Sequence, residues 1–360
     1  MSEMTIPIGP QHPLLKEPIS VSLDVSGERI VRARISTGYV HRGLERLAER
    51  RTYEQNVVVV ECICGICSHV HTMAYCQAIE ALAGIEAPER AKYIRVLLCE
   101  LERIHSHLLW MGVLAEAIGF TAIFMYAWRE REAILDIMEE ISGGRIAHGA
   151  NVIGGVCADI SADKAAHSLA RLRTFRQEME LFMDVLERDR SFRRRTQGIG
   201  VLAAEMARTF GQVGPPARAS GIDVDMRRDA PYAAYPRLAF DVITATAGDV
   251  WSRAQVRMRE IIQSLYLCHQ VIQSLPEGPL AARSPRRVPP GEVTMRCEAP
   301  RGELFYYVRA EGGPSPARLK VRTPSVPQFV ALEHTLPGLE TADFAAVIAG
   351  ADLCIACADR

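Results

Sequence analysis

The stretch Glu61-Cys62-Ile63-Cys64-Gly65-Ile66-Cys67-Ser68-His69-Val70-His71 contains a cysteine pair, Cys64 and Cys67, separated by two residues. A second pair with the same spacing, Cys354-Ile355-Ala356-Cys357, lies at the other end of the chain. This spacing lets two sulfur atoms converge on one metal ion, and two such pairs can form a four-thiolate site. Because the pairs are so distant in sequence, only a folded core could bring them together. They therefore predict a metal site buried between distant segments, unlike a local zinc ribbon.

The composition is that of a chain able to bury a large core. Of its 360 residues, 48% are hydrophobic and 24% are charged, which excludes a disordered polymer. The formal net charge of −1 provides no basic field for nucleic acid or an anionic membrane surface. The ten cysteines are too few for a disulfide scaffold. The start of the chain lacks the basic and apolar regions of a signal peptide, so we expect metal ligation before disulfides.

Two regions of the sequence are predicted to be rich in β-structure. In the N-terminal segment, residues 1–60, apolar and polar residues alternate over 19–25 and 30–35, with Ser26-Gly27 between them as a turn. This pattern is typical of a β-hairpin. The second region, residues 291–325, contains three predicted strands, at 293–297, 304–309 and 317–322.

The central residues 61–275 are predicted to form a helical core. Apolar residues recur at helical spacing from Ile94 to Leu108, after a start at Pro88. Further helices are predicted at 130–141, 162–188 and 236–275. A segment rich in proline and glycine then ends the helical region, and residues 341–360 form a C-terminal metal-binding segment with a short helix. We therefore expect one domain, residues 1–360, that is mainly α with small β-sheets (α+β).

The apolar stretch from Leu108 to Trp128 is long enough to cross a bilayer. Glu116 lies within it, however, and Gly119-Phe120-Thr121 predicts a break. Arginines lie on both sides, so no difference in charge would orient a membrane span. We interpret the stretch as parts of two helices buried in the helical core or against another subunit.

Several separated blocks of sequence resemble a known family. Residues 61–71, together with the terminal cysteine pair and Glu298-Ala299-Pro300-Arg301-Gly302, resemble the large subunit of [NiFe]-hydrogenases. Three further blocks indicate its energy-converting, membrane-associated branch, which is related to respiratory complex I and includes the hydrogenase induced by carbon monoxide. These blocks are residues 9–13, 38–45 and 102–108. The resemblance spans the chain and implies the helical-bundle core of the hydrogenase large subunit.

The resemblance implies that the four cysteines bind a Ni–Fe centre whose iron carries carbon monoxide and cyanide ligands. By position, Cys64 and Cys354 resemble the terminal nickel ligands, and Cys67 and Cys357 resemble the bridges to iron. Soft thiolates suit such metals. A terminal thiolate such as that of Cys354 can also accept a proton when hydrogen is split.

Three further residues match family positions beside the metals. Arg301 resembles the arginine that overhangs the centre, where a fixed cation stabilises developing charge. Ser325 resembles the residue that hydrogen-bonds a cyanide ligand, and His71 the histidine beside a bridging thiolate. Without the resemblance these would be read as a surface arginine, a turn serine and a buried core histidine.

Two carboxylates are implied by the same resemblance. Glu17 resembles the glutamate that relays protons from the terminal thiolate, which a raised pKa would favour. Glu45 resembles a ligand of a second metal, usually magnesium, near the C-terminus. Many relatives complete that second site with a terminal histidine, whereas this chain has Arg360. From the residues alone, both glutamates would be read as solvated charges.

The remaining cysteines show no second set of ligands, and most are expected to be small buried hydrophobes. They are Cys62, Cys76, Cys99, Cys157, Cys268 and Cys297. No iron–sulfur cluster is therefore expected in this chain, and its electrons must be exchanged with a partner. The retained Met1 favours direct synthesis of a chain ending at Arg360 over removal of a C-terminal extension.

The predicted function is reversible reduction of protons to hydrogen, coupled to ion translocation. The implied partners are an iron–sulfur small subunit, a ferredoxin-like subunit, polytopic ion-translocating subunits and a carbon monoxide dehydrogenase, without nucleic acid. The expected location is the cytoplasmic side of the membrane, as a peripheral subunit. One alternative is a complex I-like subunit that binds quinone without nickel; the cysteine pairs argue against it. A zinc-stabilised scaffold would explain the thiolates but not Glu17, Arg301 and Glu45.

Overall fold

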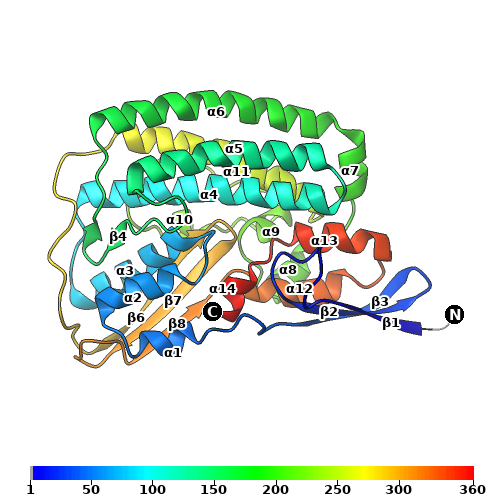
Figure 1. Ribbon diagram of the computed structural model, residues 1–360, viewed down its shortest axis with the longest axis horizontal. Helices are drawn as coiled ribbons and strands as arrows, with labels where there is room; N and C mark the ends of the chain where they lie inside the picture. Colours follow the sequence, from blue (N-terminus) through cyan, green and yellow to red (C-terminus); the bar gives the residue numbers. More distant parts are fainter. Residues whose placement is uncertain (1–2) are drawn as a thin grey trace.

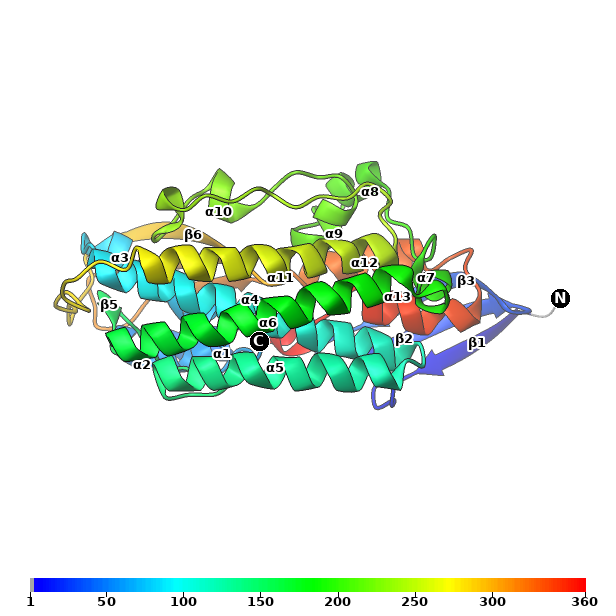
Figure 2. The ribbon, with the colours of Figure 1, turned by 90° about the horizontal axis from the view of Figure 1, so that it is seen from above.

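A bundle of four long helices dominates the computed structural model, which describes residues 3–360. The bundle consists of α4 (Glu89–Ala117), α5 (Thr121–Ser142), α6 (Ala162–Arg188) and α11 (Val250–Gln273). These helices run along the long axis of the molecule (Figures 1 and 2). Helix α4 packs against α5 and α11, and α6 covers those two. The predicted helical core is confirmed, as is a fold that is mainly α with small sheets.

The boundary between α4 and α5 explains the long apolar stretch. Helix α4 begins after Pro88, with Glu89 in its first turn, where a carboxylate favours the positive end of the helix dipole. It ends before Gly119, whose φ of +88° suits glycine, and α5 starts at Thr121. The predicted break is therefore confirmed. Among residues 3–360, no helix combines the length and apolar character that a membrane span requires.

An antiparallel sheet of three strands forms one end of the molecule. Strands β2 (Ser20–Ser26) and β3 (Arg29–Ser36) confirm the predicted hairpin, and β1 (Glu3–Ile8) adds an unpredicted strand to the edge of β2. The strands end at Ser36. Two short helices follow, α1 (Leu44–Ala48) and α2 (Tyr53–Glu61), so β-structure does not extend over all of residues 1–60.

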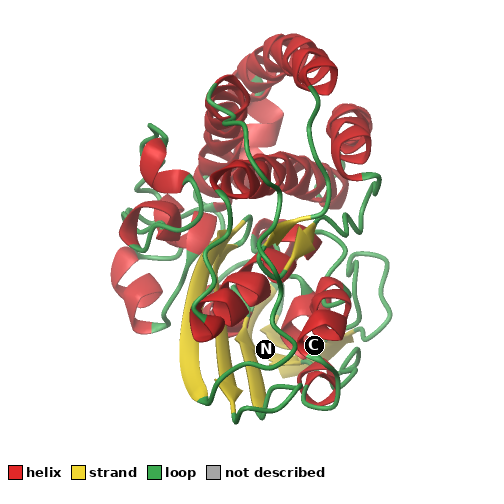
Figure 3. Cartoon of the chain, turned by 90° about the vertical axis from the view of Figure 1, so that its left-hand side faces the viewer, coloured by secondary structure: helices red, strands yellow, loops and turns green. Residues whose placement is uncertain are grey.

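A second sheet of three strands lies below the bundle and packs against α3 (Ser68–Ala83) (Figure 3). Its antiparallel strands run in the order β6 (Gly291–Ala299), β7 (Gly302–Ala310) and β8 (Arg318–Arg322), which confirms the three predicted strands. Buried and partly exposed residues alternate along β7, as expected for a strand with one face on the core. A short pair, β4 (Asn151–Val152) and β5 (Gly155–Val156), completes the sheets of the described chain.

The prediction of one helix over residues 236–275 is wrong in its first part. Helix α11 begins only at Val250, and the chain before it is irregular apart from one turn at Tyr235–Arg237. The side chain of Asp249 accepts a hydrogen bond from Ser252 N at 2.7 Å and so caps the helix. Gly248, with a φ of +67°, directly precedes this cap. The predicted helix over 236–275 does not take this start signal into account.

Short helices connect the larger elements, and several of them line one side of the bundle in Figure 2. They are α7 (Arg190–Thr196), α8 (Ala204–Thr209), α9 (Gly214–Ala219), α10 (Met226–Asp229), η1 (Tyr235–Arg237), α12 (Val326–Thr335), η2 (Thr341–Asp343), α13 (Phe344–Gly350) and α14 (Ile355–Asp359). The predicted C-terminal helix corresponds to η2 and α13. The chain ends between the two larger sheets (Figure 1).

Candidate metal centre

The fold brings the two cysteine pairs together. Cys64 Sγ and Cys354 Sγ lie 3.3 Å apart, and Cys67 Sγ and Cys357 Sγ lie 3.4 Å apart. All four thiols are buried and free, and these separations are too long for a disulfide bond of about 2.05 Å. The convergence that the spacing predicted is thus present in the structure.

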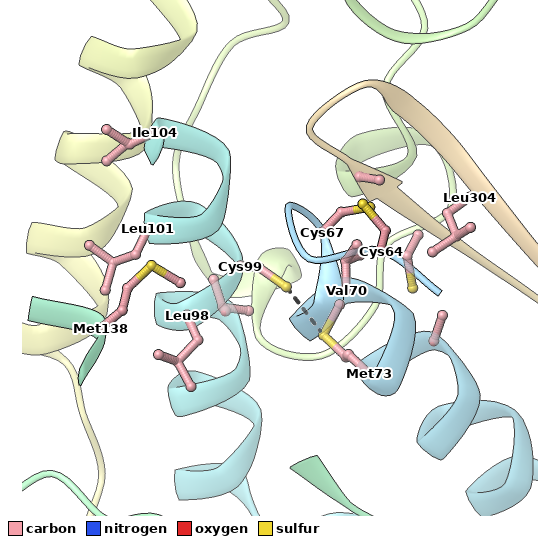
Figure 4. Close-up of a cluster of buried hydrophobic side chains, with 14 of the residues drawn as sticks. Cys64, Cys67, Val70, Met73, Leu98, Cys99, Leu101, Ile104, Met138 and Leu304 are labelled. Carbon is pink, nitrogen blue, oxygen red and sulfur yellow. Dashed lines mark hydrogen bonds between the residues drawn. The ribbon is translucent and has the colours of Figure 1, made fainter. Parts of the chain in front are cut away.

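Local structure places the cysteines at the starts of two helices. Cys67 is the residue before α3, and Cys64 lies in the turn between α2 and α3. Figure 4 shows both side chains at this end of α3, near Leu304 of β7. The N-terminal end of a helix favours a thiolate over a neutral thiol. Cys354 precedes the last helix, α14, in the same way.

The four thiols are coupled electrostatically. The thiols of Cys354, Cys357 and Cys67 donate hydrogen bonds to Cys64, which holds the pKa of Cys64 well below its ordinary value. Donating such hydrogen bonds, together with burial, holds the pKa of Cys357 well above it. Negative charge in this group is therefore favoured at Cys64 and opposed at Cys357. A bound cation would be needed to keep all four sulfurs deprotonated.

Arg301 lies at the tip of the β6–β7 hairpin and is buried. Its Nε donates to the Asp352 carbonyl oxygen at 3.0 Å, and another guanidinium nitrogen lies 2.8 Å from the Asp352 carboxylate. Burial opposes its charge, but Asp352 and the cysteine sulfurs raise the pKa of Arg301 above its usual value. Gly214, at the start of α9, packs closely against this hairpin tip. A Cβ at Gly214 would come within 2.3 Å of the Arg301 carbonyl oxygen, so no larger residue fits there.

Glu17 lies beside the C-terminal cysteine pair, although it comes from the loop between β1 and β2. Its carboxylate accepts hydrogen bonds from Ile355 N and, at 3.1 Å, from Ala356 N. Burial raises the pKa of Glu17, and the two backbone hydrogen bonds oppose this only in part. Glu17, Arg301 and Asp352 line one cavity of about 110 Å³ whose other walls are mostly apolar. A carboxyl group with a raised pKa therefore borders the site.

His71 and Ser325 also lie next to the cysteines. His71 Nε2 is 3.6 Å from Cys357 Sγ, and its Nδ1 forms a hydrogen bond of 2.7 Å with the Tyr306 hydroxyl. Burial lowers the pKa of His71 to about 4, so the imidazole is neutral near pH 7. Ser325 Oγ accepts a hydrogen bond from Cys354 N at 3.0 Å. Both residues therefore contact the second cysteine segment.

Glu45 occupies a different position, on the outer side of the C-terminal tail. Its carboxylate accepts hydrogen bonds from Arg360 Nε at 2.7 Å, from Lys320 Nζ at 2.9 Å and from Val321 N at 3.0 Å. Burial opposes the charge, but these donors lower the pKa of Glu45 overall. Magnesium prefers about six oxygen ligands, whereas this carboxylate already faces two cationic side chains. These residues do not fit a magnesium site.

The donor set at the cysteines does fit a centre of two metals. Two groups of residues each bring three potential ligand atoms within 4.8 Å of one another. The first group is Cys64, Cys354 and Cys357, and the second is Cys67, His71 and Cys357. They share the sulfur of Cys357, as a bridging ligand would be shared. Thiolates suit nickel, iron and zinc, so ligand chemistry alone does not choose among them. Elsewhere among residues 3–360, no comparable group of His, Cys, Asp or Glu comes together.

Three residues at the centre had no individual role in the sequence interpretation. Asp352 holds Arg301, and its φ of +55° turns the chain just before the second cysteine pair. Glu102 accepts hydrogen bonds from His69 N at 2.7 Å and Val70 N at 3.1 Å, at the start of α3. Arg42 contacts the backbone of both cysteine-bearing segments. Glu102 and Arg42 lay within the quoted blocks, but nothing in the local pattern distinguished them from surface charges.

The other cysteines agree in part with the prediction. Cys76, Cys99, Cys268 and Cys297 are buried, and Cys99 donates a hydrogen bond to the sulfur of Met73 at 3.6 Å (Figure 4). Cys62 and Cys157 are exposed instead. Cys62 directly follows α2 and shares no face with Cys64, because the backbone there is a turn rather than a strand.

Comparison with known families is consistent with this fold and site. The family described as "Respiratory-chain NADH dehydrogenase, 49 Kd subunit" matches residues 117–290 and 281–360. The family described as "Nickel-dependent hydrogenase" matches residues 42–124, which include the first cysteine pair. The chain belongs to the hydrogenase-related oxidoreductase family of large subunits that unites these two groups.

Individual relatives extend over the whole chain. The carbon monoxide-induced hydrogenase of Rhodospirillum rubrum is 39% identical over 100% of both chains. A subunit of the NADH-quinone oxidoreductase of Trichlorobacter lovleyi is 36% identical over 99% of this chain and 98% of its own length. Among solved structures, a chain of the membrane-bound sulfane sulfur reductase, an archaeal respiratory membrane complex, superimposes with a TM-score of 0.94. That chain is 32% identical, and the match covers 100% of this chain and 98% of the other.

Proposed function

We propose that this chain is the catalytic subunit of a [NiFe]-hydrogenase that reduces protons to hydrogen and reversibly oxidises hydrogen. The observation that carries the proposal is the convergence of four buried, free thiols next to a buried arginine and a carboxyl group with a raised pKa. A structural zinc site would require the thiols but neither Arg301 nor Glu17. The relative from Rhodospirillum rubrum, itself named a hydrogenase, supports the same reaction.

The side chains at the site would have different roles, set by their chemistry. A bound Ni–Fe centre, with carbon monoxide and cyanide on the iron, would carry the electrons that a partner delivers or receives and would provide the place where hydrogen is formed or split. Cys64, Cys67, Cys354 and Cys357 would hold it. Cys354 would accept or deliver a proton through its thiolate, since a terminal thiolate retains some basicity. Ser325, fixed against Cys354 N, would present its hydroxyl to a ligand of the iron.

Glu17 and Arg301 would act around the thiolates. Glu17 is held against the backbone of the second cysteine segment, so its carboxyl group can pass protons between Cys354 and the 110 Å³ cavity. Arg301, held by Asp352, would keep a positive charge over the site and exclude water from it. His71 would donate to or orient the thiolate of Cys357 from its position at 3.6 Å.

Two electrons and two protons make one molecule of hydrogen, and the electrons must reach the site from outside the chain. Outside the cysteine centre, the described residues bring together no other group of three or more potential metal ligands. An iron–sulfur small subunit would therefore dock beside the cysteines and receive electrons from a ferredoxin-like subunit or a carbon monoxide dehydrogenase. The solved relative belongs to a respiratory membrane complex, which supports a peripheral location on the cytoplasmic side, beside ion-translocating subunits.

The second candidate is a complex I-like subunit that binds quinone without nickel. It is favoured by the larger share of the chain that matches the 49 kDa subunit family. The cavity beside Glu17, at about 110 Å³, is however smaller than the roughly 300–1,000 Å³ typical of sites for organic ligands. A quinone subunit also has no need of four converging thiols.

Activity measurements on the purified complex separate the two candidates. We expect hydrogen evolution with a reduced viologen dye and exchange of deuterium gas with solvent protons, both lost in Cys64→Ser. The matched control is Cys62→Ser, because Cys62 is exposed and lies outside the site. Quinone reduction without any hydrogen exchange, unaffected by Cys64→Ser, would overturn the proposal in favour of the second candidate.

A further inference from the structure

The C-terminal tail is held by a segment far away in sequence. Residues 38–45 and 356–360 lie against each other, and we call the pair the tail clasp. At its centre, the Asp359 carboxylate accepts hydrogen bonds from Gly38 N at 2.8 Å and Val40 N at 3.2 Å. The ring of His41 contacts the Asp359 carbonyl oxygen. Asp359 is 7% exposed, so its side chain is largely shielded from water, while Gly38 and His41 on the other side of the contact are exposed.

Arg42 connects the tail clasp to both cysteine-bearing segments. Its guanidinium donates to the carbonyl oxygens of Cys62 at 2.7 Å and Ile63 at 2.8 Å, and to that of Ala356 at 3.2 Å. One side chain thus holds the backbone just before Cys64 and just before Cys357. A displacement of the tail would therefore also change the distance between the two cysteine pairs.

The outer end of the tail clasp is an ion pair. Arg360 Nε donates to Glu45 Oε1 at 2.7 Å, and both side chains are only 15% exposed. The same guanidinium donates to the Ala358 carbonyl oxygen at 2.6 Å. Lys320 Nζ lies 2.9 Å from Glu45 Oε2. The carboxylate at this point is neutralised by side chains of the chain itself.

We propose that Arg360 is a built-in cation that closes the tail clasp in place of a second metal, so that the metal centre is retained without a divalent cation at Glu45. A half-buried arginine–carboxylate pair supplies the positive charge that a metal would bring. A divalent cation placed beside Glu45 would instead be repelled by Arg360 and Lys320. This inference rests on a metal being bound by the four cysteines, whichever metal that is.

The first test uses the purified complex without any substitution. We expect magnesium far below one equivalent per chain after gel filtration. We also expect no change in the metal content of the four-cysteine site, or in its spectroscopic signature, after treatment with EDTA under conditions that spare tightly held thiolate metals. A stoichiometric magnesium ion, whose removal also releases the metal at the cysteines, would overturn the proposal.

The second test uses substitutions in the tail clasp. Arg360→Ala should lower the retained metal several-fold, and Arg360→Lys should restore most of it, because a cation remains. Glu45→Gln should have a similar effect, and the double variant should be no worse than either single change, as expected for two residues acting as one pair. The matched control is Arg318→Ala, because Arg318 pairs with Glu49 at 2.9 Å and does not touch the tail.

The outcome is independent of the identity of the bound metal. If the cysteines hold zinc, the proposed hydrogenase function fails, but loss of zinc in Arg360→Ala still supports the tail clasp. Full retention of metal in Arg360→Ala would contradict it, even if hydrogenase activity were present in the unsubstituted complex.

Discussion

Two buried clusters of ionisable groups lie side by side in this molecule. The candidate metal centre gathers four thiols that pair with one another, with His71, Arg301 and the carboxyl group of Glu17 beside them. The second cluster, which we call the ion-pair network, lies between α4, α9, α10, α11 and β6. Its members are Glu100, Arg103, Arg218, Asp225, Arg227, Glu260 and Glu298, all at most 2% exposed.

In the ion-pair network, four carboxylates share three arginines. Arg218 lies 2.8 Å from Glu260 and 2.7 Å from Glu298, and Arg227 lies 2.7 Å from Asp225. Each of its carboxylates has an arginine partner, so nothing in the network requires a ligand. The candidate metal centre differs, because its four thiols have beside them the single charge of Arg301, which is already paired with Asp352. The comparison teaches that unmatched ligands, rather than buried charge as such, mark the functional site.

The largest expected effect is that of Cys354→Ser, which should abolish hydrogen evolution while the fold is retained. An alcohol is a poor ligand for a soft metal, and the substitution creates no cavity. Activity, metal content and circular dichroism of the complex would be measured together. Cys268→Ser, a buried cysteine outside the site, is the control and should keep the metal. Substantial activity in Cys354→Ser would contradict the claim that the thiols, unlike the ion-pair network, hold a catalytic metal.

Glu17→Gln should lower turnover and hydrogen–deuterium exchange on the order of 100-fold, because the titrating group of the proposed relay is removed. The metal should remain bound, since Glu17 is not one of its ligands. Glu116→Gln serves as the control, because this exposed carboxylate pairs with the neighbouring Lys16 and lies outside the proposed path. Unchanged exchange in Glu17→Gln would move the relay to another residue.

Asp225→Asn tests the ion-pair network. Breaking a buried ion pair leaves a charge unmatched, so the free energy of unfolding should fall by about 3–5 kcal/mol at pH 7 in urea titrations. The metal content of the molecules that do fold should stay unchanged. Asp24→Asn, which breaks an exposed pair with Arg34, should have little effect.

The pH dependence of this loss has a defined sign. Burial opposes ionisation of Asp225, but Arg227 and Arg218 outweigh it and lower its pKa to about 2. Because the folded-state value lies below that of the unfolded chain, near 4, the stabilisation is present above pH 4 and is lost as the pH falls toward 2. The gap between the wild-type chain and Asp225→Asn should therefore narrow below pH 4. A gap that widened on acidification would contradict this assignment.

The smallest expected effect is that of Tyr306→Phe, which removes the hydroxyl bound to His71 and leaves the ring. His71 would keep its contact with Cys357 but lose the partner that fixes its orientation. The lost hydrogen bond is worth about 1 kcal/mol, so turnover should fall less than tenfold. The spectroscopic signature of the metal should also shift. A loss as large as that of Cys354→Ser would place Tyr306 among the essential groups.

The fold was largely predictable because its elements carry regular local patterns. Alternation identified β2 and β3, the strands of the second sheet were also predicted, and helical spacing identified α4 and α6. The prediction is wrong at residues 236–249 because it overlooks the start signal formed by Gly248 and the cap at Asp249. The spacing within the two cysteine pairs predicted that they converge in the fold. The positions of Glu17 and Arg301 beside them could be predicted only from the family resemblance.

The ion-pair network and the supports of the site could not be predicted in this way. Arg218 and Glu298 are 80 residues apart and look like ordinary charged residues until the fold joins them. Asp352 lies close before the second cysteine pair, but its hold on Arg301 depends on where the β6–β7 hairpin docks. Such contacts are set by tertiary packing and leave no periodic signal in the sequence.

The central claim is that the four unmatched thiols hold nickel and iron. Elemental analysis of the complex purified without chelators tests it most directly, with the same analysis on Cys64→Ser to assign the metals to this site. We predict about one nickel per chain, bound by soft thiolates and lost in the variant. Iron would be counted after subtracting that of the partner clusters, and should leave about one per chain. Zinc alone, or no metal that depends on Cys64, would contradict the claim.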